Sequence, residues 1–135
     1  MARYEHLPLY KKAMELGICL QEAVRNFSRY NKYSIGTDIR DLSRNILLLI
    51  IRTNSRREKT AVLIELVENC EMLKTTIAFA KEIKAFNNFK SFQHAAGLET
   101  TLCKQSEGWL KSTIKGRNHQ LSNVAQGFSP AHKDG

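Results

Sequence analysis

The chain has 135 residues, of which 42% are hydrophobic and 25% charged, and its formal net charge is +8. This length suits one globular domain that buries a core without disulfides or a metal, and the longest apolar run, residues 46–51, is too short to cross a membrane. A polar start and three cysteines at no metal-binding spacing argue against a signal peptide and a disulfide framework, so we expect a cytoplasmic protein.

Apolar residues recur at steps of three and four along the first two segments, which is the spacing of amphipathic helices. A first helix is expected near residues 7–30 and a second near 35–54, where Ser34 or Thr37 is a candidate N-cap. Gly36 is costly inside a helix and indicates a close approach of two helices. The predicted buried stripes are Leu9, Ala13, Leu16, Leu20, Ala23, Phe27 and Tyr30, followed by Ile35, Ile39, Leu42, Ile46, Leu49 and Thr53.

Two further helices complete the predicted fold. Ser55 and Glu58 have the spacing of a capping box, which predicts a third helix near residues 56–86. Asn87 and Asn88 separate it from a fourth helix near 89–115, after which a polar composition predicts a flexible tail over 116–135. No segment alternates with period two, so we expect an all-α, antiparallel up-and-down four-helix bundle over residues 1–115. The remaining stripes are Leu63, Leu66, Cys70, Leu73, Ile77 and Ala80, followed by Ala95, Leu98, Leu102 and Trp109.

The second helix carries apolar residues on both faces. On a helical wheel, Leu47, Leu48 and Ile51 point away from the predicted stripe, on the same side as Arg40 and Arg44. Either the rest of the bundle covers this back face, or it packs against another subunit. Four helices have little spare surface, so we favour a homo-oligomer with these three residues at its interface.

The positive charge is concentrated in two segments. Residues 25–59 hold nine Lys or Arg against three Asp or Glu, and residues 104–117 hold four against one. The segments 1–24 and 60–103 are close to neutral. A segregated basic field attracts the phosphate backbone of RNA or DNA, although basic residues also simply decorate exposed helix faces.

Motifs of catalysis are absent from the sequence: it has no zinc-protease, phosphate-loop, serine-hydrolase or C-x-x-C pattern. We therefore expect no enzyme, no cofactor and no metal. His94 stands alone and is expected at the bundle edge or in solvent. Glu65, Glu68 and Glu71 form an acidic run that we interpret as a solvated helix face rather than a cation site.

Several segments resemble a known family in the same order. These are residues 27–30 (FSRY), 32–36 (KYSIG) with Ile39 and Arg40, 81–86 (KEIKAF), 89–92 (FKSF) and 107–110 (EGWL). Over residues 4–115 the chain resembles the four-helix-bundle family that includes the accessory variability determinant (Avd) of diversity-generating retroelements and the proteins encoded within 23S rRNA intervening sequences. The resemblance implies a non-catalytic subunit that forms pentameric barrels and binds the element's reverse transcriptase and template RNA to support mutagenic cDNA synthesis.

Two interpretations remain open, a retroelement accessory protein and a self-assembling interaction module with no retroelement role. For the first, the resemblance implies nucleic-acid or polymerase contact by Arg25, Arg29, Lys32, Arg40 and Arg44. Charge alone adds Arg52, Arg56, Arg57, Lys104, Lys111 and Lys115. Tyr30, Tyr33 and Trp109 are the nearby aromatic residues on which unpaired bases could stack, although Tyr30 is expected in the core and Trp109 in the core or an interface.

Overall fold

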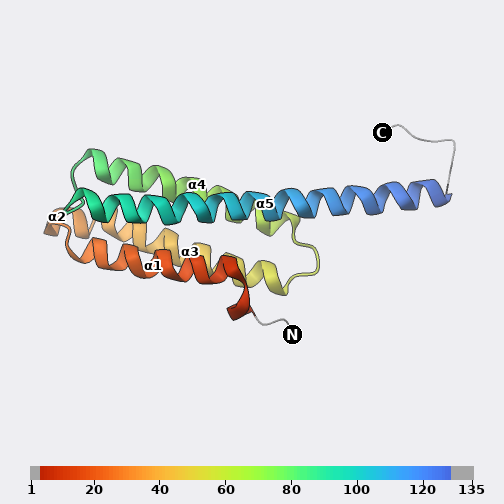
Figure 1. The fold of residues 1–135 in the computed structure, drawn as a ribbon, viewed down its shortest axis with the longest axis horizontal. Coiled ribbons are helices and arrows are strands. Elements are labelled where there is room, and N and C mark those ends of the chain that lie inside the picture. Colours follow the sequence, from red (N-terminus) through yellow and green to blue (C-terminus); the bar gives the residue numbers. More distant parts are fainter. Residues whose placement is uncertain (1–3, 129–135) are drawn as a thin grey trace.

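The computed structural model describes residues 4–128, with side chains through residue 118, and it shows an antiparallel up-and-down four-helix bundle (Figure 1). No strand occurs in this part of the chain, and the predicted all-α fold is confirmed. The elements are a 3-10 helix η1 (Tyr4–His6), α1 (Pro8–Arg25), a single turn α2 (Arg29–Lys32), α3 (Ile35–Ser55), α4 (Thr60–Glu82) and α5 (Phe89–Phe128).

The four long helices form a square in which each packs against two neighbours. α1 contacts α3 and α5, and α4 contacts the same two helices, so α1 and α4 lie at opposite corners, as do α3 and α5. The spacing that predicted the helices also predicted the core: Leu42 and Trp109 are half-buried and every other stripe residue except Tyr30 is buried. The residues that fill the centre include Leu16 and Leu20 of α1, Ile39 and Ile46 of α3, Leu63, Leu66, Leu73 and Ile77 of α4, and Leu102 of α5.

The first helix is shorter than predicted. α1 ends at Arg25, and Ser28 starts the separate turn α2 because its Oγ accepts a hydrogen bond from the Asn31 backbone N–H at 3.4 Å. The break turns Phe27 into the core, where it is 4% exposed, and turns Tyr30 outward, where it is 82% exposed. The expectation that Tyr30 belongs to the core is therefore wrong.

Gly36 lies at a close approach of elements, as predicted. A Cβ at this position would meet Val24 Cγ1 at 2.7 Å and the Asn31 carbonyl oxygen at 3.0 Å. Only glycine lets the start of α3 pass this close to the end of α1 and to α2.

The third helix begins later than predicted, because the expected capping box does not form. Ser55 remains in α3 and donates to the Arg52 carbonyl oxygen at 3.0 Å. Glu58 Oε1 accepts from the Thr60 backbone N–H at 2.9 Å, at the start of α4. Lys59 Nζ donates to the Thr53 and Arg56 carbonyl oxygens at 2.9 and 2.6 Å, so it occupies acceptors at the end of α3.

The fourth long helix differs most from its prediction. α5 begins at Phe89, where Asn88 Oδ1 accepts from the Ser91 backbone N–H at 2.8 Å, but it continues to Phe128 instead of ending at 115. Its C-terminal part extends past the other helices (Figure 1). The expected flexible tail beyond Phe128 lies outside the described residues. None of the described helices, α5 included, has the length and apolar character to cross a lipid bilayer.

Candidate nucleic-acid interface

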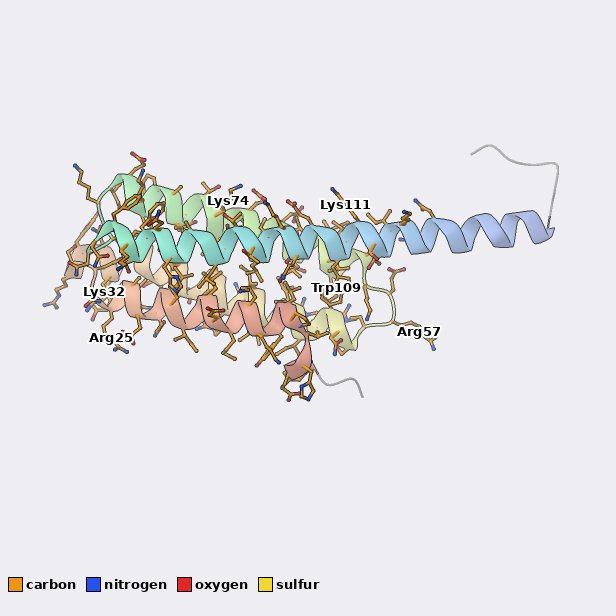
Figure 2. All side chains as sticks on the ribbon, in the orientation of Figure 1. Arg25, Lys32, Arg57, Lys74, Trp109 and Lys111 are labelled. Carbon is orange, nitrogen blue, oxygen red and sulfur yellow. The ribbon has the colours of Figure 1, made fainter. Side chains whose placement is uncertain are left out.

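The structure separates the predicted basic residues into groups that point in different directions. Arg25, Arg29 and Lys32 lie at one end of the bundle, which we call the α2 end (residues 25–34 and 81–92), and Arg57 lies at the other end (Figure 2). The 21 residues of α3 separate the two ends by roughly 30 Å. The remaining predicted cations are Arg40, Arg44 and Arg52 on α3, Arg56 beside Arg57, and Lys104, Lys111 and Lys115 on α5, which lies diagonally across the bundle from α3.

Aromatic contacts join the two chain segments that form the α2 end. The ring centroids of Phe27 and Phe86 lie 5.3 Å apart, and those of Phe86 and Phe92 lie 5.6 Å apart, both with edge-to-face geometry. Phe89 packs against Phe92 at 5.6 Å. These contacts hold the α4–α5 connection against the α1–α2 connection, so residues some 60 positions apart in the sequence share one surface.

This arrangement adds three cations that the sequence analysis missed. Lys81, Lys84 and Lys90 are exposed at the α2 end, and Lys81 Nζ lies 5.6 Å from the centroid of the Phe92 ring. They escaped notice because the segment 60–103 is nearly neutral as a whole: acidic residues in the first half of α4 cancel them. Counting charge separately for each half of the third predicted helix would have found Lys81 and Lys84, whereas Lys90 lies in the fourth predicted helix.

Lys84 occupies a backbone position that favours glycine. Its φ is 61°, and the Ala85 N–H donates to the Ala80 carbonyl oxygen at 2.9 Å while the Lys84 N–H donates to that of Lys81 at 3.0 Å. This is the Schellman arrangement at the end of α4, in which the left-handed residue is usually glycine. A lysine here costs stability and places a cation on the α2 end.

Exposed aromatic rings lie among these cations. Tyr30, Tyr33 and Phe89 are 82%, 68% and 61% exposed. The turn that carries the two tyrosines is held by Ser34 Oγ, which donates to the Tyr30 carbonyl oxygen at 2.7 Å. Trp109, by contrast, packs against the core, as expected. Rings that face solvent between Lys and Arg side chains offer both stacking surfaces for bases and charges for phosphates.

Some predicted cations form ion pairs on the surface. Arg25 pairs with Glu22 at 3.0 Å, Arg44 with Asp41 at 3.2 Å and Arg52 with Glu65 at 3.6 Å, all between largely exposed side chains. Exposed pairs of this kind contribute only about 0–1 kcal/mol. They leave these arginines available to a phosphate.

The acidic run does not form one patch. Glu65 turns toward α3 to pair with Arg52, whereas Glu71 turns toward α5, where Cys103 Sγ lies 3.0 Å from Glu71 Oε2. Glu68 lies between them, and all three side chains are exposed, as expected for a solvated helix face. His94 is exposed, as expected.

The predicted interface residues on α3 are only partly exposed. Leu47 and Ile51 are half-buried, Leu47 against the core, and Leu48 is 50% exposed. Leu47 lines a groove of about 280 Å³ between α1 and α3, together with Met14, Gly17, Ile18, Arg40 and Arg44.

Another exposed apolar surface lies on α4 and its C-cap residue, Ile83, where the sequence analysis placed none. Ile64, Met72, Phe79 and Ile83 are 41–57% exposed. They fall within about 100° of one another on the helical wheel, opposite the buried stripe. We call these four residues the α4 stripe.

Comparison with known proteins found no match to the chain among protein families, curated proteins or solved structures.

Proposed function

We propose that this protein is a non-catalytic accessory protein that binds single-stranded RNA or DNA at the α2 end with little regard to sequence. The proposal is supported above all by one juxtaposition: three exposed aromatic rings lie among six cations contributed by two distant segments. Lysine and arginine neutralise phosphates without reading bases. Aromatic rings stack on any base that is not paired, which favours single strands over duplexes.

The predicted salt dependence follows from the number of cations. If Arg25, Arg29, Lys32, Lys81, Lys84 and Lys90 each neutralise one phosphate, the log–log slope of affinity against salt is roughly −4, at about −0.7 for each contact with a single strand. Fluorescence anisotropy with labelled single strands of unrelated sequence measures this slope. An affinity that stays constant as salt rises contradicts the proposal.

A pair of charge reversals tests the location. Lys84→Glu/Lys90→Glu changes the charge at the α2 end, and Arg56→Glu/Arg57→Glu makes the same change at the opposite end. We expect the first variant to lose affinity at least tenfold and the second to lose much less. Equal losses mean that only net charge matters and that the α2 end is not the site.

A further pair of substitutions tests the stacking. Tyr30→Ala/Tyr33→Ala should weaken single-strand binding by about 1–3 kcal/mol for each base that loses its ring, with little effect on the weak binding of a duplex. Since both rings are largely exposed, the fold should survive, and circular dichroism checks this. Unchanged single-strand affinity would leave a purely electrostatic interaction.

In the retroelement setting that the resemblance implies, the bound strand is the template RNA and the partner is the element's reverse transcriptase. Reverse transcriptases are usually basic, as this chain is, and two basic proteins repel each other. We therefore propose that RNA bridges the two proteins. A pull-down with the cognate reverse transcriptase, with and without ribonuclease, tests this. Loss of the complex after digestion is the expected result, and no complex under either condition removes the retroelement role.

The second candidate function is a self-assembling module, and two surfaces favour it. On the helical wheel, Glu68 lies within the α4 stripe and Glu65 lies at its edge, and Arg40 and Arg44 line the α1–α3 groove. An apolar stripe that carries acidic residues complements an apolar groove that carries basic residues on another copy, and two different complementary patches close a ring, which the resemblance implies is a pentamer. Native mass spectrometry of the wild type, Phe79→Asp and Leu48→Asp tests this, and a single-chain mass for the wild type refutes it.

A further inference from the structure

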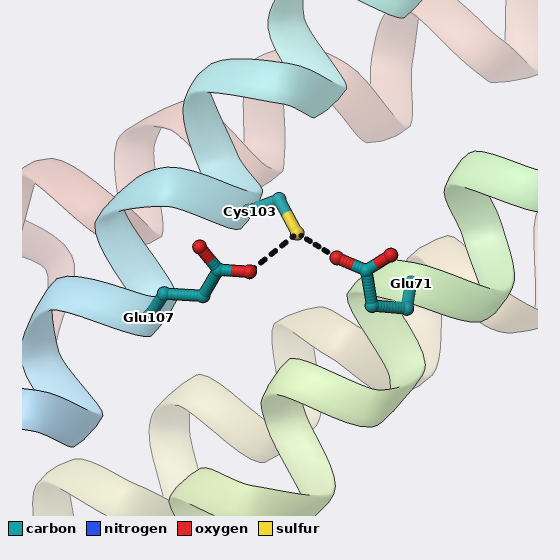
Figure 3. A group of neighbouring side chains, drawn as sticks. All are labelled: Glu71, Cys103 and Glu107. Atoms are coloured by element: carbon teal, nitrogen blue, oxygen red, sulfur yellow. Dashed lines mark hydrogen bonds between the residues drawn. The ribbon is translucent and has the colours of Figure 1, made fainter.

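Three side chains with metal-binding atoms meet between α4 and α5. Figure 3 shows Cys103 of α5 between Glu71 of α4 and Glu107 of α5. Cys103 Sγ lies 3.0 Å from Glu71 Oε2 and 3.9 Å from Glu107 Oε2, and one ligand atom from each residue lies within 4.8 Å of the others. The sequence gives no hint of this cluster, because Glu71 and Cys103 are 32 positions apart.

The spacing of these atoms suits a single ion. A tetrahedral zinc ion has Zn–S bonds of about 2.3 Å and Zn–O bonds of about 2.0–2.2 Å, which separate neighbouring sulfur and oxygen ligands by roughly 3.5 Å. The two observed separations bracket this value. Small rotamer shifts of two glutamates would bring both oxygens to it.

A buried carboxylate next to the cluster lacks a partner. Glu99 lies one helical turn before Cys103 on the face of α5 that packs on α4, is 1% exposed, and its Oε2 makes no hydrogen bond. Burial first, and then the charges of Glu71 and Glu107, raise the pKa of Glu99. Burial, the hydrogen bond to Glu71 and the charge of Glu99 likewise raise the pKa of the Cys103 thiol. Glu99 is not among the three residues whose ligand atoms meet, so it is a neighbour of the cluster and not one of its ligands.

Among the described side chains, the charge of the cluster is not balanced by an ion pair. Among the residues whose side chains are described, no Lys or Arg forms an ion pair with Glu71, Glu99 or Glu107, although the chain carries 21 such residues. The charge of Lys74 lowers the pKa of Glu99, more strongly than the charge of Glu71 or Glu107 raises it, and the two residues line one pocket between α4 and α5. Two carboxyl groups meet one thiol in a protein that is basic overall, and a divalent cation would remove the repulsion between them.

We propose that Glu71, Cys103 and Glu107 bind one Zn²⁺ ion that joins α4 to α5. On binding, the S–H bond of Cys103 breaks, its proton leaves to solvent, and the sulfur forms a bond to zinc with no change of oxidation state. A thiolate with two carboxylates suits a borderline-soft ion better than Mg²⁺ or Ca²⁺, which prefer oxygen alone.

Cobalt is the probe, because Co²⁺ replaces Zn²⁺ in tetrahedral sites and a thiolate ligand gives it a charge-transfer band in the near ultraviolet. The full chain, freed of metal with a chelator, is titrated with Co²⁺, and Zn²⁺ is then added in competition. We expect a thiolate band that saturates at one ion per chain and disappears when Zn²⁺ displaces Co²⁺. Histidines elsewhere in the chain give no thiolate band.

Three variants assign the band. Cys103→Ser should abolish it, Glu107→Gln should weaken Co²⁺ binding at least about tenfold, and Cys19→Ser, which removes a half-buried thiol on α1, should leave it intact. Zn²⁺ should raise the Tm of the wild type and of Cys19→Ser but not of Cys103→Ser. Circular dichroism establishes that each variant folds. No band in the wild type, or a band of unchanged affinity in either Cys103→Ser or Glu107→Gln, overturns the proposal.

Discussion

Replacing Glu99 by glutamine should stabilise the bundle at alkaline pH and not at acidic pH. Glu99 is 1% exposed, and one of its carboxyl oxygens has no hydrogen-bond partner. Its pKa is raised from 4.5 to about 7, because burial and the charges of Glu71 on α4 and Glu107 on α5, which raise it, together outweigh the charge of Lys74 on α4, which lowers it. The folded state therefore favours the neutral acid.

The sign and size of the effect follow from that pKa. Because the folded pKa lies above the unfolded one, the folded state binds an additional proton between pH 4.5 and 7, and this stabilisation is complete below 4.5 and lost as pH rises through about 7. At about 1.4 kcal/mol for each pKa unit, the carboxylate destabilises the folded protein above pH 7 by about 3 kcal/mol. Glutamine carries no charge, so Glu99→Gln should raise the free energy of unfolding above pH 7 by about 1–3 kcal/mol. The gain is reduced if the buried glutamine amide lacks hydrogen-bond partners.

Urea unfolding at pH 5 and pH 8, with a chelator present, measures this. The free energy of unfolding of the wild type should fall from pH 5 to pH 8 by more than that of Glu99→Gln. Glu68→Gln, which removes an exposed carboxylate from α4, is the matched control and should behave like the wild type. The reasoning is refuted if wild type and Glu99→Gln show the same pH dependence.

Three further predictions concern the fold. Leu66→Ala should lower the free energy of unfolding by about 2–5 kcal/mol, because Leu66 is 0% exposed; a loss below 1 kcal/mol in urea would mean that the core closes around the gap. Gly36→Ala should destabilise by about 1–3 kcal/mol, since the new methyl would meet Val24 Cγ1 at 2.7 Å; an unchanged Tm would disprove this close approach. Lys84→Gly should gain up to about 1 kcal/mol of stability by relieving the left-handed residue and should weaken single-strand binding; a loss of stability would contradict the Schellman geometry.

Helix type and buried face could be read from the sequence because both are local. Steps of three and four place residues such as Leu63 and Ile77 on one side of a helix, whatever that helix packs against. Helix ends were less predictable, because several side chains compete for the same backbone groups. Ser55 could have capped a new helix, but it is the last residue of α3. Backbone groups between α3 and α4 are instead hydrogen-bonded by the side chains of Glu58 and Lys59.

The candidate sites, by contrast, depend on which helices become neighbours. The sequence by itself determined that this is a basic, all-helical bundle with Arg25, Arg29 and Lys32 close together. The tertiary structure alone decided that Lys81, Lys84 and Lys90 lie at the same end of the bundle as these three cations. The antiparallel packing of α4 and α5 likewise placed Glu71 next to Cys103. The spacing of residues within a helix determines which of them share a face. Which other helix packs against that face depends on long-range contacts, and these cannot be read from a local pattern.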